Sequence, residues 1–387
     1  MPDPLLSAAA SGVTEPDPVD RLILDEAAEL GVVDVPLAVV GDATGALAVA
    51  AAERFDLDTV RTFHDAVSEE RASDDAVRAS FRSLKAVRFG LEPALFDGAR
   101  LVLLRLPKSL AELDEIARLV AAHAHPEVRI VAGGRIKHMS RGMNETLERS
   151  FESVTASLGR QKSRVLHASA PKAELRGAAS AYPIVQSSDE LGFSIASHGG
   201  AFAGPRLDLG TRELLSALRD LPADELPEAG LAVDLGCGTG VLAVALARLR
   251  PELEVIASDR SWAAVSSARE TVRIAGVEDR VEVRREDAGS SIETGSVDVV
   301  LLNPPFHDRH EVVEDMAHPL FEQAARMLRP GASMLTVFNS GLAHRAALER
   351  IVGPSTQISR GAKFTVVLSR RRDEKWRIRA SGRASGR

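Results

Sequence analysis

The sequence contains very little cysteine and few aromatic residues. Cys237 is the single cysteine among 387 residues, so no disulfide can form within the chain, and we expect a reducing, cytoplasmic setting. No uncharged apolar run approaches the roughly 18 to 20 residues that span a bilayer, and the first residues lack the positive stretch of a secretory signal. No membrane association and no metal site are therefore expected. Aromatic residues make up only 4% of the chain, which argues against a broad stacking platform for bases.

Acidic and basic residues are strongly segregated along the chain. The overall net charge is −7, which by itself argues against a nucleic-acid binder. Residues 1–75 hold 17 acidic and 4 basic side chains, whereas residues 131–172 hold 8 basic and 3 acidic ones. Residues 369–387 add 8 basic and 2 acidic side chains. Such segregation can create local positive fields on an acidic protein.

The length and the alternation of elements indicate two α/β domains. A chain of this length, with 45% apolar residues, can form two cores. From about residue 230 to 370, apolar strands alternate with helices, which indicates a parallel, doubly wound sheet with a last strand of open direction. The expected strands are 231–235, 254–258, 280–284, 297–302, 333–338 and 364–369. Between them we expect helices at 241–250, 262–276, 310–328 and 342–352.

The first half of the chain contains a degenerate copy of the sequence motifs of the second half. Residues 41–50 read GDATGALAVA and residues 236–245 read GCGTGVLAVA, while LLRLPK (103–108) aligns with LLNPPF (301–306). Chance similarity of two Gly/Ala-rich helices is the alternative, but two matches in one order favour a duplication. The copy has Val39 in place of a carboxylate and Arg105 in place of an amide, so we infer that it lacks the chemistry. We expect a degenerate domain at 1–185, a catalytic domain at 186–369 and a basic, flexible tail at 370–387, with 168–190 as the connection.

The segment VDLGCGTG (233–240) predicts a nucleoside pocket. A glycine loop after a parallel strand lets the backbone approach a ligand closely. A nicotinamide fingerprint would need glycine where this chain has Val241, and the carboxylate of Asp234 suits a ligand with a positive amino group. S-adenosyl-L-methionine carries an ammonium and a sulfonium, so it is the expected cofactor. Further strand ends supply Asp259, for ribose hydroxyls, and Asp287 beside Ala288, for an adenine amine; the alternative for each acid is a solvated charge.

The segment NPPF (303–306) predicts a slot for a planar group that carries an NH2. It follows an apolar strand at the edge where open α/β sheets bind ligands. We expect the Asn303 side-chain oxygen and the Pro304 carbonyl to accept the two amine hydrogens, because Pro304 and Pro305 supply no backbone donors. Phe306 would stack on the planar group. A simple turn after a strand is the alternative, and the glycine loop nearby disfavours it.

These motifs resemble those of ribosomal RNA guanine-N2 methyltransferases with tandem Rossmann-like halves, from about residue 35 to 369. The stretch from NPPF to FNSGL resembles the large-subunit enzymes more than the small-subunit ones. The resemblance implies two Rossmann-like methyltransferase domains, the N-terminal one degenerate and assisting RNA binding. It also implies a target guanine at Asn303 to Phe306 and a cofactor site made of these positions: Asp234, Gly236, Gly238, Gly240, Asp259, Asp287 and Ala288.

The expected activity is therefore methyl transfer from S-adenosyl-L-methionine to the exocyclic N2 amine of a guanine in ribosomal RNA, free or in an assembling subunit, by a monomer. The candidate phosphate-binding cations are Arg135, Lys137, Arg141, Arg160, Lys162 and Arg164; a solvated face is the alternative for them. Two other functions remain open. A glutamine-N5 methyltransferase acting on a protein would use the same slot, more often with tyrosine than with Phe306. A non-catalytic RNA-binding assembly factor is disfavoured because the loop and Asn303 are intact.

Overall fold

The chain folds into two compact units. The computed structural model describes residues 15–31, 36–80, 84–304 and 310–372. Unit 1 comprises Met1–Pro183 with His198–Gly200, and unit 2 comprises Ile184–Ser197 with Ala201–Arg387. The three residues 198–200 follow the predicted domain boundary at 185/186 in sequence but pack with unit 1. Most of the predicted tail, residues 373–387, lies outside the described residues.

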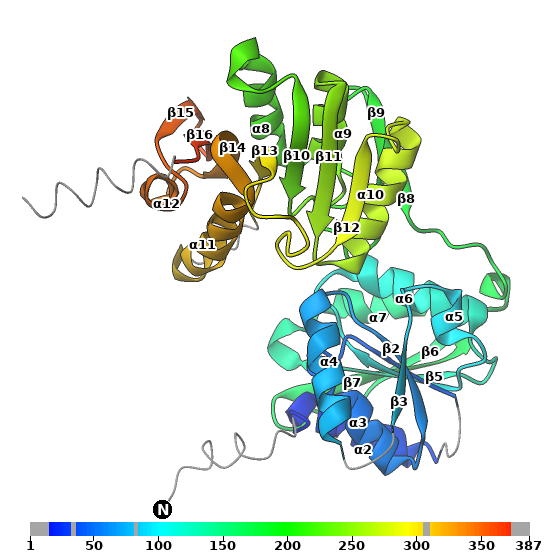
Figure 1. Ribbon diagram of the computed structural model, residues 1–387. Helices are drawn as coiled ribbons and strands as arrows, with labels where there is room; N and C mark the ends of the chain where they lie inside the picture. The colour runs from blue at the N-terminus through cyan, green and yellow to red at the C-terminus, as the bar shows by residue number, and fades with distance from the viewer. Residues whose placement is uncertain (1–14, 32–35, 81–83, 305–309, 373–387) are drawn as a thin grey trace, which may run out of the picture. The chain divides into compact units, whose positions relative to one another are not determined.

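Unit 2 is built on a seven-stranded sheet with the order β12-β11-β10-β13-β14-β16-β15 (Figure 1). The strands from β12 to β14 pair in parallel, whereas β16 pairs antiparallel with both β14 and β15. The last strand, whose direction was open, is thus antiparallel. The bounds are β10 (Ala229–Leu235), β11 (Glu252–Asp259), β12 (Val281–Arg285), β13 (Val297–Leu302), β14 (Leu328–Asn339), β15 (Ser355–Arg360) and β16 (Phe364–Arg370). The six predicted strands are confirmed. Strand β15 was missed because its residues, STQISR, are mostly polar and give no apolar run.

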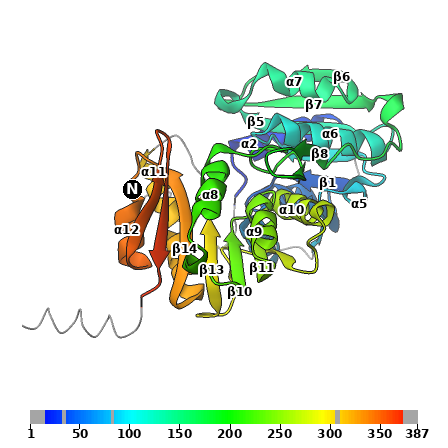
Figure 2. The same ribbon diagram turned by 90° about the horizontal axis from the view of Figure 1, so that it is seen from above.

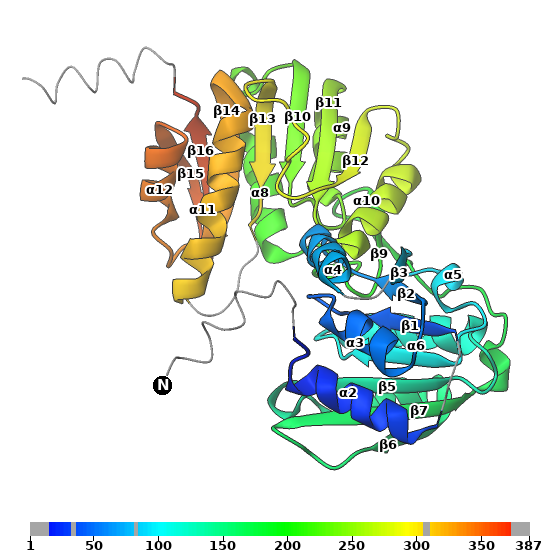
Figure 3. The same ribbon diagram turned by 60° about the horizontal axis from the view of Figure 1, so that its bottom comes forward.

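Helices cover both faces of this sheet because alternate residues of each strand point to opposite sides. Ala232 of β10 belongs to the core under α8 (Leu209–Asp220), α9 (Val241–Leu249) and α10 (Trp262–Ala275). Its neighbour Val233 belongs to the core under α11 (His310–Met327) and α12 (His344–Ile351), which Figure 3 shows beside β14 and β16. A short 3-10 helix, η4 (Ala223–Glu225), and a separate hairpin of β8 (Ile184–Ser188) and β9 (Phe193–Ser197) complete the described part of unit 2. The predicted connection at 168–190 is therefore partly strand.

Unit 1 repeats the topology of unit 2. Its sheet has the order β3-β2-β1-β4-β5-β7-β6, with an antiparallel pair β7–β6 at the end. Figure 2 shows β6 beside β7 at this end of the sheet. The strands are β1 (Leu37–Val40), β2 (Thr59–Phe63), β3 (Lys85–Arg88), β4 (Leu101–Arg105), β5 (Arg129–Arg135), β6 (Phe151–Ala156) and β7 (Ser163–Pro171). The helices are α2 (Pro18–Glu29), α3 (Ala46–Arg54), α4 (Val67–Ala79), α5 (Pro93–Phe96), α6 (Leu110–His123) and α7 (Arg141–Glu148), with turns η2 (Ile136–His138) and η3 (Ala173–Leu175). The identical strand order supports the duplication inferred from the sequence.

The described residues give no sign of a membrane span. No helix among them is long and apolar enough to cross a bilayer. The helices instead bury an apolar face against a sheet, as the core residues of α2 and α3 do against β1 and β4.

Candidate active site

The glycine loop between β10 and α9 opens toward a cavity at the carboxyl end of the unit 2 sheet. Gly236, Gly238 and Gly240 adopt left-handed φ angles of 74°, 53° and 79°, which side chains of L-residues rarely allow. A Cβ added to Gly236 or Gly238 would meet no atom within 4 Å, whereas one on Gly240 would lie 3.0 Å from the Cβ of Ala268 on α10. The first two glycines therefore leave space for a ligand, and the third permits close packing of the loop against α10.

Asp234 holds the glycine loop to α9 through a hydrogen bond. Its side chain is fully buried, and its Oδ2 accepts a hydrogen bond of 3.0 Å from the backbone N–H of Ala243 in α9. Burial, aided by the charge of Asp259, raises the pKa of Asp234 to about 7. Asp234 does not line the cavity, so the structure places this predicted ligand contact behind the loop rather than in the pocket.

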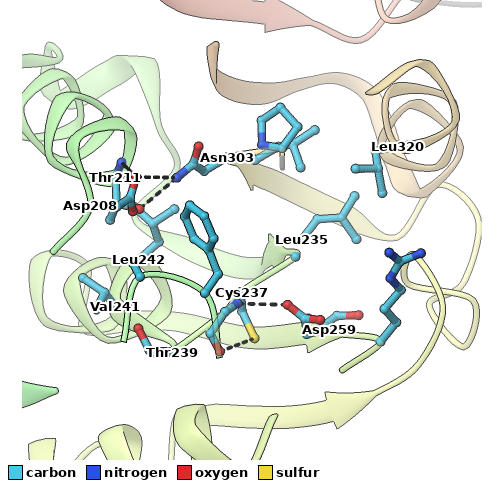
Figure 4. A pocket seen from close by; sticks show the side chains of 18 of the residues that line it. Asp208, Thr211, Leu235, Cys237, Thr239, Val241, Leu242, Asp259, Asn303 and Leu320 are labelled. Atoms are coloured by element: carbon cyan, nitrogen blue, oxygen red, sulfur yellow. Dashed lines mark hydrogen bonds between the residues drawn. The ribbon is translucent and has the colours of Figure 1, made fainter. Parts of the chain in front are cut away.

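The cavity has a volume of about 500 Å³, within the range of small-molecule sites. Five of the predicted cofactor positions line it, together with two positions of the predicted slot: Gly236, Gly238, Asp259, Asp287, Ala288, Asn303 and Pro304. Gly240 does not line it, and Pro305 and Phe306 lie outside the described residues. Figure 4 shows the apolar wall, made in part by Leu235, Val241, Leu242 and Leu320. Four strand ends thus meet at one pocket, as the sequence predicted.

Asp259 ties the glycine loop to the second strand. Its Oδ2 accepts from the N–H of Gly238 at 3.0 Å (Figure 4). Its Oδ1 accepts from the N–H of Ser261 at 2.9 Å. These bonds hold the carboxylate at the rim of the cavity, where it remains acceptor-only while ionised. Carboxylates at Asp259 and Asp287, an apolar wall and an open glycine loop fit a nucleoside with a positively charged tail. Among the described residues, no group of three or more His, Cys, Asp or Glu side chains could hold a metal ion.

The side-chain amide of Asn303 has a fixed orientation. Its Nδ2 donates to the Thr211 Oγ1 at 2.9 Å and to the Asp208 Oδ1 at 3.4 Å (Figure 4). An ionised carboxylate can only accept, so the atom that faces Asp208 must be the amide nitrogen. The Asn303 Oδ1 is buried and has no hydrogen-bond partner among the described residues. Buried polar atoms are normally paired, so this oxygen is an unsatisfied acceptor on a residue that lines the cavity.

One wall of the pocket was not predicted from the sequence. Phe202, Arg206, Asp208 and Thr211 line the cavity, and none was named as a site residue. Asp208 caps α8, since its carboxylate accepts from the N–H groups of Gly210 and Thr211. An Asp directly before an amphipathic helix is a recognisable capping signal. That signal predicts a helix start but not that the helix start faces Asn303, which lies 95 residues away.

The corresponding loop of unit 1 is filled by protein atoms. Gly41 matches Gly236 in the alignment of the two halves, but a Cβ on Gly41 would meet the carbonyl oxygen of Arg105 at 3.1 Å and its Cβ at 3.2 Å. Unit 1 has not lost its loop carboxylate, which corrects the inference drawn from Val39. Asp42 accepts from the N–H of Ala48 at 2.9 Å, as Asp234 does from Ala243. Unit 1 therefore keeps a carboxylate that holds the loop to the helix, at a different position, but it does not keep the space for a ligand.

Arg105 also replaces the amide acceptor of unit 2 with an ion-pair network. Its Nη1 lies 2.7 Å from the Asp17 Oδ1 and 2.6 Å from the Asp20 Oδ1, and Asp17 is the N-cap of α2. Burial opposes ionisation of Asp17, but hydrogen bonds from Arg105 and the backbone lower its pKa to about 2. Asp208 and Thr211 hold Asn303 in the same way at the start of α8. Unit 1 thus keeps the contact between helix start and strand end but presents a paired cation instead of an acceptor.

The six predicted RNA-binding cations lie on neighbouring elements of unit 1. Arg135 ends β5 and pairs in register with Ser163 of β7, next to the pair Gly134–Arg164. The N–H of Ile136 donates to the carbonyl of Lys162 at 2.9 Å. Two stretches distant in sequence are therefore brought together, with most of their cations exposed: Lys137, Arg141, Arg160, Lys162 and Arg164.

Comparisons with known proteins agree with this architecture. The family model described as "Methyltransferase small domain" matches residues 192–368, and the one described as "RLMG N-terminal domain" matches residues 17–172. The chain is 34% identical over 358 residues to ribosomal RNA large subunit methyltransferase G of Pseudomonas paraeruginosa (strain DSM 24068 / PA7), covering 91% of this chain and 92% of that protein. It is 36% identical over 270 residues to the protein of the same name from Pseudomonas putida (strain W619), covering 70% of each.

A solved structure shares the whole two-unit fold. The Thermus thermophilus 16S rRNA N2 G1207 methyltransferase, solved in complex with AdoMet and guanosine, matches with a TM-score of 0.73 over 92% of both chains. Its sequence identity is 21%, so this likeness concerns the fold. The tandem α/β architecture predicted from the sequence is thereby confirmed.

Proposed function

We propose, from the premise that this chain belongs to the family of ribosomal RNA large subunit methyltransferase G, that unit 2 transfers a methyl group from S-adenosyl-L-methionine to the N2 amine of a guanine in large-subunit ribosomal RNA. The observation that carries the proposal is the fixed Asn303 amide, whose oxygen is unpaired and which lines a cavity of nucleoside size. The test is to incubate the protein with methyl-labelled S-adenosyl-L-methionine and ribosomal RNA, and to measure the label that the RNA retains on a filter. Large-subunit ribosomal RNA should accept label, and small-subunit RNA should accept far less.

The cofactor would be held by the residues of the glycine loop and the strand ends. When bound, S-adenosyl-L-methionine supplies an electrophilic methyl group. Gly236 and Gly238 admit the ligand because no protein atom occupies the space next to them, and the Asp259 carboxylate accepts hydrogen bonds from ribose hydroxyls. Asp287, also at the cavity, accepts from the adenine amine.

The slot residues position the amine rather than activate it through a strong base. The Asn303 Oδ1 and the Pro304 carbonyl accept the two N2 hydrogens, which directs the nitrogen lone pair at the methyl carbon. The amine becomes acidic once it is methylated, so its proton leaves without a strong base. Cys237 also lines the cavity, but burial raises the pKa of its thiol well above the usual value. This thiol is therefore protonated and serves as a packing residue, not as a nucleophile.

Thr211 acts as a positioning residue for Asn303 in this proposal. Thr211→Val keeps the shape but removes the closer of the two acceptors for the amide nitrogen, so only the longer bond to Asp208 restrains the amide. We expect kcat to fall about tenfold, the effect of one lost hydrogen bond, while the KM for the cofactor stays the same. Thr211→Ser, which keeps the hydroxyl, should restore kcat. Steady-state kinetics of both variants checks this, and an equal loss in both would assign Thr211 to packing alone.

The cations of unit 1 would bind RNA phosphates. Each phosphate contact contributes about 0.7 to 0.9 to the slope of log affinity against log salt. Replacing Arg135, Lys137 and Arg141 with Gln should therefore lower that slope by roughly 2 units, in binding assays across a salt series. Three exposed cations of unit 2 serve as the matched control: Arg219, Arg269 and Arg345. An unchanged slope in the unit 1 variant would remove these residues from the RNA surface.

A ribosomal substrate implies that the reaction takes place in the cytoplasm, and one chain carries both the slot and the cations, so we propose a monomer. A glutamine amide of a protein would fit the same slot in shape. Transfer of label to protein rather than to RNA would assign the chain to that reaction. RNA binding without transfer of a methyl group to RNA or protein would indicate a non-catalytic assembly factor.

A further inference from the structure

The tip of the β6–β7 hairpin presents an apolar side chain to solvent. Leu158 is 85% exposed, and Ile136 of η2, next to the hairpin, is 42% exposed. A Cβ on Gly159 would lie 3.0 Å from the Ile136 Cδ1, so the Ile136 side chain reaches the backbone of the tip beside Leu158. Singly exposed apolar residues are ordinary, but here two adjoin at the end of a projecting hairpin.

The surroundings of this tip are cationic and lack carboxylates over long stretches. Residues 128–144 and 153–173 contain no Asp or Glu. Pairing of β5 with β7 brings Arg135 and Lys137 beside Lys162, whose carbonyl accepts from Ile136. Among the described residues, two Arg side chains of these stretches have an ion-pair partner: Arg160 lies 4.0 Å from Glu29 and Arg141 lies 3.5 Å from Glu145, and all four side chains are exposed. Such a surface pair contributes little, so the positive field around Leu158 is not cancelled.

We infer that Leu158 and Ile136 contact the bases of the RNA substrate, while the surrounding cations contact its phosphates. This inference rests on the proposed function and adds a contact that charge alone does not provide. Phosphates need only cations, but an unpaired base at a loop or helix end has an apolar face that must be covered when it leaves a stack. Apolar side chains that project among cations are the kind that proteins insert between bases. A protein partner with an acidic, apolar patch is the other class of occupant.

Leu158→Ser tests the inference. We expect the affinity for deproteinised large-subunit ribosomal RNA to fall about tenfold at every salt concentration, in line with the loss of one buried leucine side chain. The salt slope should stay that of the parent, because no cation is removed. Leu158→Phe should retain or increase the affinity, since an aromatic ring stacks on bases. Val185, 50% exposed in unit 2, provides the matched control, and Val185→Ser should bind as the parent does.

The outcomes separate the inference from the function on which it rests. Equal RNA affinity of the parent and Leu158→Ser across the salt series overturns the inference. If Leu158→Ser and Leu158→Phe both keep RNA binding but lose association with protein-containing subunits, the tip is a protein contact, and the inference is again wrong. If the parent protein neither binds nor methylates ribosomal RNA, the proposed function fails. Since Leu158 is exposed, thermal unfolding of the variants should match that of the parent.

Discussion

Replacing Asn303 with Ala is expected to lower kcat by roughly 100- to 1,000-fold, the range found when one preorganised hydrogen-bonding group is removed from an active site. The Asn303 Oδ1 is a buried, unpaired acceptor on a residue that lines the cavity, and the bonds of its Nδ2 to Thr211 and Asp208 fix the amide. Without it, the target amine is held by the Pro304 carbonyl alone and samples unproductive orientations. Steady-state methyl transfer to large-subunit ribosomal RNA measures the loss.

Binding measurements distinguish this effect from a damaged pocket. Asn303→Ala should bind S-adenosylhomocysteine and RNA with affinities within about threefold of those of the parent. The reason is that Asn303 is assigned to the guanine amine that receives the methyl group and not to the cofactor. Asn339 is an exposed asparagine at the end of β14 and does not line the cavity, so Asn339→Ala is a suitable control and should keep full activity. Retention of more than a tenth of kcat in Asn303→Ala would contradict the assigned role.

Replacing Gly238 with Ala is expected to weaken cofactor binding by about 30-fold or more, which corresponds to about 2 kcal/mol. Gly238 has a φ of 53°, and the space beside it contains no protein atom within 4 Å. We therefore expect a methyl group there to occupy the ligand's place. Calorimetric titration with S-adenosylhomocysteine measures the loss.

Gly276 separates the steric effect from backbone strain. It ends α10 with a φ of 66°, and it too has no atom within 4 Å of an added Cβ, but it does not line the cavity. Gly276→Ala should show the same strain, about 1 to 2 kcal/mol in unfolding free energy, with unchanged cofactor affinity. If the two variants lose affinity equally, the open space beside Gly238 is not the cofactor site.

The sequence predicted the elements of unit 2 well because its buried strands are continuous apolar runs. VDVVLL, for example, appears as β13 with the predicted bounds. Strands with exposed side chains, such as β15 and β8, lack that signal and were missed. The loop residues could be predicted because repeated glycines before a helix indicate positive φ angles, which residues with side chains rarely adopt.

The details of the site could not be predicted, because they depend on contacts across long sequence distances. The carboxylate of Asp234 at a strand end does not reveal whether it faces a ligand or the N–H of Ala243, and the structure shows the latter. Likewise, Val39 suggested a lost carboxylate, whereas Asp42 supplies the same brace three residues later. Asp208 caps the helix that contains Thr211, and only the fold brings these two residues to Asn303.

The identity of the methylated nucleoside tests the central claim most directly. Large-subunit ribosomal RNA should be deproteinised, incubated with the protein and S-adenosyl-L-methionine, and digested to nucleosides for mass spectrometry. The account predicts N2-methylguanosine as the product with the parent protein and its near absence with Asn303→Ala. A methyl group on another nucleoside, on a ring nitrogen of guanine or on protein glutamine would contradict it.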